Sequence, residues 1–288
     1  MSEICVVHLV RAANGLAPFS RFLDSYKKNP GGLDHQLLII FKGFPRAADT
    51  APYRALLADY SFQSFMISDF GFDIRPYFMA AERFDHTYFC FLNSFSVLLD
   101  THWLLKLYKH IVRPDVGLVG ASGSYASVIR PAQLVDPSKP LYMRLLRAIK
   151  RPLASAYLAI YFDAFPNYHI RTNAFMIARD TMLKLNRGHV LTKLHTYRLE
   201  SGKCGITKQV GKMGLRTLVV GKDGLGYDKK DWICSNTFWQ GTQSNLLVSD
   251  NQTRKYDDSD MYWKRLLEVF AWGHAGHESA AVTRDKMR

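Results

Sequence analysis

The chain lacks long hydrophobic runs, paired cysteines and a secretion signal. No apolar segment approaches the roughly 20 residues that a membrane-spanning helix requires. The opening residues, MSEICVVHLV, have no basic segment and no cleavage site. The four cysteines are far apart and include no C-x-x-C pair, so neither a zinc site nor a disulfide framework is indicated. These absences predict a reducing, cytoplasmic location.

Acidic residues are also scarce relative to basic ones. Asp and Glu number 25 against 38 Lys and Arg, which gives a net charge of +13. An excess of this size indicates an anionic partner, such as a nucleotide diphosphate or an anionic membrane surface, although surplus surface lysines would give the same number. The basic residues are spread along the chain without a nucleic-acid motif, so we expect no nucleic-acid partner.

Strand and helix patterns alternate through the first half of the chain. Apolar strand patterns are found at residues 4–10, 36–41, 64–67, 88–92 and 116–121. Helical patterns follow them at 14–26, 45–60 and 73–84, and from Asp100 or Thr101 onward. This order predicts an α/β fold with a mostly parallel central sheet and helices on both faces.

The second half is less regular. We expect a strand over residues 170–178, a helix from Asp180, a helical segment over 192–212, a strand at 217–221 and a last helix over 261–272. Neither an internal repeat nor a Pro/Ser-rich linker is present, so a single domain over residues 1–273 is predicted. Residues 274–288 have little apolar content and are expected to form a disordered tail.

The most informative segment is YFCFLNSFSVLLDTHWLL, which begins at Tyr88. An apolar strand ends there in the small polar residues Asn93, Ser94 and Ser96, and open α/β sheets bind their ligands at such strand ends. These side chains can hydrogen-bond a phosphate or a sugar hydroxyl. They lack the carboxylates that retain a hard cation.

Three segments in order resemble a GT-A glycosyltransferase domain, and they are similar above all to the inverting family-two enzymes. The first is the opening pair of strands, which ends in Phe41-Lys42-Gly43. The second is the helix, strand and helix from Phe72 to Leu107. In the family its strand reads "FLDaDD", whereas here Asn93 and Phe95 stand at the positions of the Asp-x-Asp acids. The third, YRLESGKCGITKQVGKMGLRTLVV, looks like the segment that carries the catalytic base and places Glu200 at the acidic position.

The resemblance implies a nucleotide-sugar donor, and the missing acids predict catalysis without a metal ion. Arg11, Lys42 and Arg75, near predicted strand ends, are candidates to replace the charge of the cation at the donor. Asn93, Ser94 and Ser96 are candidates to bind the donor through hydrogen bonds. For each of these three cations, the alternative interpretation is an ordinary solvated surface residue. Asp73 is a further donor candidate, with helix capping as its alternative. Cofactors are therefore expected to be absent, with Mg²⁺ or Mn²⁺ as the alternative.

Glu200 is the candidate general base, with a surface ion pair to Lys203 as the alternative role. Acceptor contacts are expected from His169 and Asn173, which lie where the family contacts its acceptor, and from Trp232 by stacking on a sugar ring. The competing interpretations are a structural histidine and core packing of the indole.

The segment from Leu141 to Phe162 interleaves cations with large apolar side chains, as interfacial helices do. It indicates either a peripheral position on the inner face of an anionic membrane or a basic helix packed on the domain.

The sequence thus predicts an inverting, metal-independent glycosyltransferase that acts on a saccharide or lipid-linked acceptor, such as a bacterial surface polysaccharide. The alternative is a non-catalytic domain on the same scaffold that binds a sugar or nucleotide or serves as a partner subunit.

Overall fold

The computed structural model describes residues 2–71, 74–129, 155–190 and 192–273, and its centre is an eight-stranded sheet with the order β11-β10-β6-β9-β4-β1-β2-β3. The strands of this sheet are β1 (Ile4–Arg11), β2 (Gln36–Lys42), β3 (Phe62–Ile67), β4 (Tyr88–Leu92), β6 (Val116–Gly120), β9 (Ala174–Ala178), β10 (Arg216–Val220) and β11 (Gly226–Tyr227). Two short ribbons pair β5 (Val97–Leu98) with β12 (Val248–Ser249) and β7 (Gly123–Ser124) with β8 (His169–Ile170).

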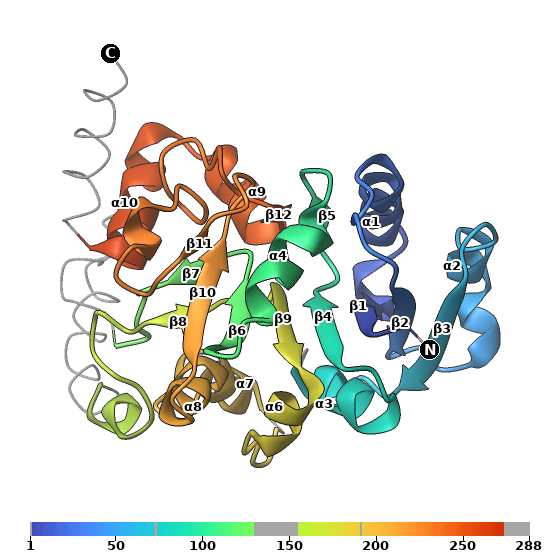
Figure 1. The fold of residues 1–288 in the computed structure, drawn as a ribbon, viewed down its shortest axis with the longest axis horizontal. Helices are drawn as coiled ribbons and strands as arrows, with labels where there is room; N and C mark the ends of the chain where they lie inside the picture. The colour runs from blue at the N-terminus through green and yellow to red at the C-terminus, as the bar shows by residue number, and fades with distance from the viewer. Residues whose placement is uncertain (1, 72–73, 130–154, 191, 274–288) are drawn as a thin grey trace, which may run out of the picture.

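Helices cover both faces of the sheet, as Figure 1 shows. The helices are α1 (Ala17–Lys28), α2 (Ala51–Ala55), α3 (Ile74–Arg83), α4 (Trp103–Ile111), α6 (Arg179–Lys184), α7 (Lys193–Ser201), α8 (Ile206–Lys212), α9 (Asn251–Asp257) and α10 (Met261–Trp272), and residues 155–161 are also helical. The apolar sides of α1, α2 and α4 pack on one face, and those of α3, α6, α7 and α8 pack on the other. Strands buried on both faces read as continuous apolar runs, which explains the sequence of β1 and β2.

One antiparallel strand divides the sheet into two parallel groups. Strands β3, β2, β1 and β4 run parallel, as do β6 and β10, whereas β9 runs antiparallel to both β4 and β6. Leu92 at the end of β4 therefore pairs with Ala174 at the start of β9. The amino end of β9 thus lies at the edge where the parallel strands have their carboxyl ends. The predicted α/β class with a mostly parallel sheet is confirmed.

Three predicted element boundaries were wrong. The helix expected from Asp100 or Thr101 begins at Trp103, because His102 adopts a left-handed conformation (φ 56°) and Asp100 instead accepts a hydrogen bond from the Thr101 N–H. The strand expected over 170–178 is divided into β8 and β9. The helix expected over 192–212 is interrupted at Gly202, whose Cβ would lie 2.5 Å from the Arg198 carbonyl oxygen if it had one.

Some predictions fall outside the described residues. These are Asp73, most of the segment from Leu141 to Phe162, and the tail at 274–288. Every helix in the described part of the chain is too short or too polar to span a bilayer.

Glutamine side chains shape the segment between β11 and β12. Gln240 accepts from the Thr237 N–H and donates to the Trp232 carbonyl, both at 3.0 Å. Gln243 accepts from the Trp239 N–H (3.0 Å) and donates to the Thr253 carbonyl (3.0 Å). These side chains satisfy backbone groups that regular structure would otherwise satisfy. They hold the segment against the sheet without a helix or a long strand.

His8 is a buried, uncharged histidine in β1. Its ring stacks on Phe22 with centroids 3.7 Å apart, and neither ring nitrogen has a hydrogen-bond partner. Burial lowers the pKa of His8 from 6.5 to about 3. Protonation of the ring therefore requires unfolding or rearrangement of this part of the core.

This burial predicts that acid weakens the fold through His8. Below pH 6.5 the unfolded chain binds a proton at His8 that the folded chain does not, so the free energy of unfolding decreases as the pH is lowered. His8 alone should account for a loss of about 2 kcal/mol between about pH 6.5 and pH 5. His8→Leu should remove this part of the pH dependence in urea unfolding at about pH 7.5 and pH 5. Exposed His189→Gln is the matched control, and an unchanged slope in His8→Leu would contradict the assignment.

Candidate functional site at the carboxyl edge of the sheet

A closed turn at residues 93–96 (the 93–96 turn) follows β4. Asn93 Oδ1 accepts from the Phe95 N–H (2.9 Å) and from Ser96 Oγ (3.1 Å). The Asn173 carbonyl accepts from the Asn93 N–H (2.8 Å), and it lies 3.2 Å from Ser96 Oγ, whose single proton it shares with Asn93 Oδ1. Ser94 and Ser96 are buried, whereas Asn93 is partly exposed. Asn93 and Ser96 therefore shape the turn and fasten it to the residue before β9.

The side chain of Asn173 is oriented by a chain of hydrogen bonds. Arg171 Nη1 donates to Ser122 Oγ (3.3 Å), and Ser122 Oγ donates to Asn173 Oδ1 (3.0 Å). A guanidinium has no acceptor, so the single hydroxyl proton of Ser122 is directed to Asn173. Asn173 Nδ2 is left as a buried donor without a partner among the described residues. Unpaired buried donors are rare in folded proteins, and each calls for an explanation.

Arg171 belongs to a buried ion pair that anchors the C-terminal segment. Its Nη2 donates to Asp250 Oδ2 at 2.7 Å, and the guanidinium lies 3.8 Å from the centroid of the Phe238 ring. Asp250 is 1% exposed and caps α9 through the N–H groups of Gln252 and Thr253. The Asp250 carboxylate thus joins α9 to residues 171–173, which immediately precede β9.

A second charged cluster lies at the ends of β1 and β2 and after β3. Asp69 accepts from Arg11 Nε (2.9 Å) and Nη2 (2.8 Å), and from Lys42 Nζ (3.0 Å). Lys42 is 1% exposed and also donates to the Asp69 carbonyl at 3.1 Å. The hydrogen bond from Arg11, together with the Lys42 charge, holds the pKa of Asp69 far below its usual value of 3.8. The structure therefore brings the predicted donor residues Arg11 and Lys42 together.

Glu200 in α7 lies beside the segment that enters β9. Its Oε1 accepts from the Thr172 N–H (3.1 Å) and Oγ1 (3.0 Å), and Thr172 is the chain neighbour of Arg171 and Asn173. Lys203 donates to the Ala159 carbonyl (2.6 Å), and the described residues show no Glu200–Lys203 ion pair. The carboxylate is thus fixed through one oxygen near the 93–96 turn.

His169 is buried next to this carboxylate. Its Nδ1 lies 2.8 Å from the Asn167 carbonyl, which makes Nδ1 the donor and leaves Nε2 as the acceptor of a neutral ring. Burial lowers the pKa of His169, and the negative charge of Glu200 partly opposes this effect.

Two other predicted residues have mainly structural surroundings. Trp232 is 0% exposed and donates its indole N–H to the Tyr227 carbonyl (3.0 Å), so it packs in the core and presents no face to a sugar. Arg75 donates to the Phe70 carbonyl (3.1 Å) and lies over the Phe70 ring. Asp73 is outside the described residues.

Among the described residues, those at and around the 93–96 turn do not form a ligand set for a divalent cation. Asn93 Oδ1 already accepts two internal hydrogen bonds, and the 93–96 turn has no carboxylate. Asp69 and Asp250 are both paired with cations, which makes them poor ligands for Mg²⁺ or Mn²⁺. The described residues contain no group of three or more His, Cys, Asp or Glu arranged to hold a metal.

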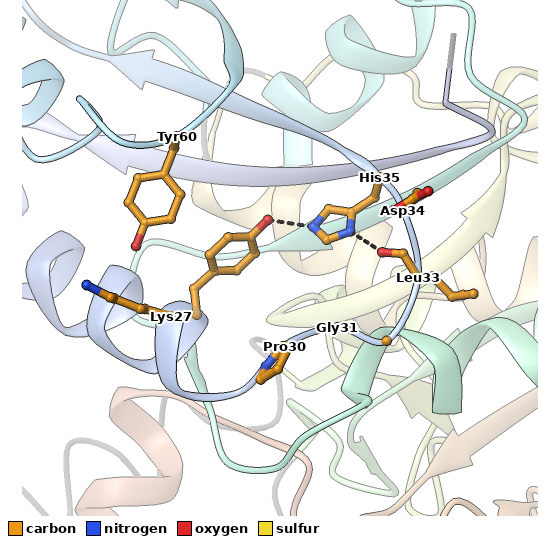
Figure 2. Close-up of a pocket in the computed structure, with 9 residues that line it drawn as sticks. Lys27, Pro30, Gly31, Leu33, Asp34, His35 and Tyr60 are labelled. Atoms are coloured by element: carbon orange, nitrogen blue, oxygen red, sulfur yellow. Dashed lines mark hydrogen bonds between the residues drawn. The ribbon is translucent and has the colours of Figure 1, made fainter.

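A pocket of about 560 Å³ lies elsewhere, at the amino end of β2 (Figure 2). It is lined by Tyr26, Lys27, Pro30, Gly31, Gly32, Leu33, Asp34, His35 and Tyr60. Tyr26 OH lies 2.5 Å from His35 Nε2, and burial lowers the pKa of this histidine. The pocket is therefore at the edge opposite to the 93–96 turn and contains none of the predicted site residues.

Sequence reasoning missed Asp69, Arg171 and Asp250. The signal for Asp69 was available, because it follows a predicted strand at its carboxyl end. Arg171 and Asp250 are 79 residues apart, and neither lies in a recognisable motif.

Neither the protein-family models nor the curated proteins contain a match to this chain. Similar solved structures include the mannosyltransferase PcManGT from Pyrobaculum calidifontis in complex with GDP-Man and Mn²⁺, at 11% identity and a TM-score of 0.49, over 97% of this chain and 73% of that one. Glucosyl-3-phosphoglycerate synthase from Mycobacterium tuberculosis is similar at 16% identity and a TM-score of 0.37, over 62% and 58%. A fragment of TarS from S. aureus is similar at 10% identity and a TM-score of 0.34, over 42% and 35%. Likeness at this level carries no conclusion about what this chain binds.

The Asp69 cluster predicts a measurable stability contribution. Asp69→Asn weakens the pairing of the buried Lys42, and the half-exposed carboxylate suggests a loss of about 1–2 kcal/mol in urea unfolding at neutral pH. Because the pKa of Asp69 is lowered by folding, this contribution is present above the unfolded value of 3.8 and is lost as pH falls below it. The control is Asp49→Asn, which changes a surface pair with the exposed Arg46 and should cost less than Asp69→Asn. Equal losses in the two variants would contradict the prediction.

Proposed function

We propose that this chain is a nucleotide-sugar-dependent glycosyltransferase whose donor lies at the carboxyl edge of the sheet. The observation that carries the proposal is the placement of Glu200. Its carboxylate binds Thr172, and the next residue, Asn173, holds the 93–96 turn. The 93–96 turn and Glu200, which belong to the segments that resemble the donor and base segments of GT-A enzymes, are more than 100 residues apart in sequence. Both are bound to residues 172–173 at one edge of the sheet.

The proposed reaction is an inverting displacement with Glu200 as general base. An acceptor hydroxyl transfers its proton to the Glu200 carboxylate while its oxygen attacks the anomeric carbon. The bond from that carbon to the donor phosphate breaks, and the electron pair leaves with the nucleoside diphosphate. Cationic side chains at the edge stabilise the charge that develops on the diphosphate, and the reaction proceeds without a divalent ion.

The proposal extends to the acceptor and to the location of the enzyme. A saccharide or lipid-linked acceptor, as in surface polysaccharide synthesis, fits the resemblance, and the net charge of +13 favours work beside an anionic membrane. His169 and Asn173 are the acceptor residues of this proposal. Both lie beside Glu200 or on the segment that Glu200 binds.

A second candidate is a non-catalytic domain that binds a sugar nucleotide. The closed hydrogen bonding of Asn93 and the pairing of Asp69 and Asp250 with cations fit it as well as they fit metal-free catalysis, because neither requires a free carboxylate for a metal. Glu200 discriminates between the two candidates, since only the enzyme requires its carboxylate.

Donor binding is the first test of the proposal. Calorimetric titration with UDP-, GDP-, dTDP- and CMP-sugars, with and without EDTA, should show one donor whose affinity is unchanged by EDTA. Loss of binding in EDTA would refute metal independence. Absence of binding to every one of these donors would refute the donor site itself.

Glu200→Gln should separate chemistry from binding. Glutamine retains an oxygen that can accept from Thr172 but cannot accept a proton from the acceptor, so turnover should fall about 10²- to 10⁴-fold with unchanged donor affinity. Glu82→Gln, which affects an exposed pair with Arg187, is the matched control. Turnover that persists in Glu200→Gln would exclude this residue as the base. If the wild-type protein binds a donor but transfers no sugar to any acceptor, the non-catalytic candidate replaces the enzyme.

A further inference from the structure

Arg254 extends from α9 to the 93–96 turn. Its Nη1 donates to the Phe95 carbonyl at 3.2 Å and to Ser249 Oγ at 3.5 Å. These are the hydrogen bonds of its guanidinium with the described residues, and they leave Nε and Nη2 without a partner there. Pairing of β12 with β5 holds α9 next to the turn. The guanidinium of Arg254 is thus hydrogen-bonded to the turn after β4, at the position where GT-A enzymes have their Asp-x-Asp acids.

Arg21 lies in α1, the helix that packs beside β5. Ser25, one helical turn farther along, accepts a hydrogen bond from the Leu98 N–H at 3.0 Å, and this contact fixes α1 beside β5. Residues four apart lie on the same side of a helix, so Arg21 faces the turn that precedes β5. Arg21 is exposed and makes no hydrogen bond or ion pair with the described residues.

Arg21 is one of the charged groups that act on Arg254. Burial lowers the pKa of Arg254, and the positive charge of Arg21 lowers it further. Two acids oppose this effect, but neither forms an ion pair with Arg254: Asp250 is bound to Arg171, and Asp258 is exposed. Adjacent cations that lack a carboxylate form a strong site for an anion.

An uncharged hydrogen-bond donor beside the 93–96 turn also supports an anion site. Asn173, whose carbonyl holds the turn, has a buried Nδ2 without a partner among the described residues. Arg11 and Lys42, in contrast, share the Asp69 carboxylate. Arg21 and Arg254, unlike Arg11 and Lys42, share no carboxylate with another described residue.

We infer that Arg21 and Arg254 form an anion site over the 93–96 turn that binds the diphosphate of a nucleotide-sugar donor. This inference rests on the proposed function for the identity of the donor. It assigns the charge-neutralising role to two residues outside the three segments that resemble GT-A enzymes. A divalent ion held by acids at the turn would be repelled by these cations, whereas a diphosphate would bridge them.

The test is calorimetric titration with inorganic pyrophosphate, UDP and GDP. Arg21→Gln and Arg254→Gln should each weaken binding of the best of these ligands about 10- to 100-fold, as expected for loss of a charge-assisted hydrogen bond. Arg265→Gln, an exposed arginine of α10, makes the same charge change and should leave the affinity unchanged. Arg254→Lys, which retains the charge but not the planar fork, should give an intermediate loss.

Arg21 is exposed and makes no hydrogen bond or ion pair with the described residues, so Arg21→Gln remains informative even if Arg254→Gln unfolds. Unchanged affinity in Arg21→Gln, or equal losses in it and in Arg265→Gln, overturns the site. Absence of pyrophosphate and nucleotide binding in the wild type also overturns it. Pyrophosphate binding that depends on both arginines, without sugar transfer, supports the site and removes the enzymatic function. If the Arg21 and Arg254 variants transfer sugar as fast as the wild type, the proposed glycosyltransferase function stands and the anion site is refuted.

Discussion

The insertion of one antiparallel strand between two parallel groups determines where chemistry can occur in this protein. Backbone pairing of β9 with β4 and β6 places its amino end beside the carboxyl ends of its neighbours. Residues 171–173 thereby join the 93–96 turn, and Thr172 orients Glu200 at the same edge. A parallel strand in this position would send these three residues to the opposite edge. The polar network at the site therefore depends on the direction of one strand.

Charge at this edge is arranged in two different ways. Asp69 and Asp250 each neutralise buried or partly buried cations and tie distant parts of the chain together. Arg21 and Arg254 have no carboxylate of this kind, so their charge is available to a ligand. The first arrangement stabilises the fold, because a buried charge that loses its partner is costly. The second gives affinity for anions, because the charge is compensated only when a ligand binds.

Local patterns in the sequence predicted most of the sheet but only part of the site. Continuous apolar runs identified β1, β2 and β4, and the polar residues after β4 marked the edge where the candidate site lies. The pairing of Arg171 with Asp250 and the approach of Arg254 to Phe95 depend on how the C-terminal segment folds back. That segment is held by the side chains of Gln240 and Gln243, which follow no period that a sequence pattern can detect. The role of Trp232 was equally ambiguous, because the sequence does not distinguish a tryptophan that packs in the core from one that stacks on a sugar ring.

The same strand order has a consequence for biosynthesis. Residues of β1, β2, β3 and β4 are contiguous with their helices in the first third of the chain, so this half-sheet can pair before β9 is synthesised. Until residues 174–178 emerge, β4 is an open edge whose residues Phe89, Cys90, Phe91 and Leu92 are apolar on both faces. Unprotected edges of this kind pair readily with other chains. The nascent protein therefore passes through an aggregation-prone stage that ends when β9 closes the gap between the two parallel groups.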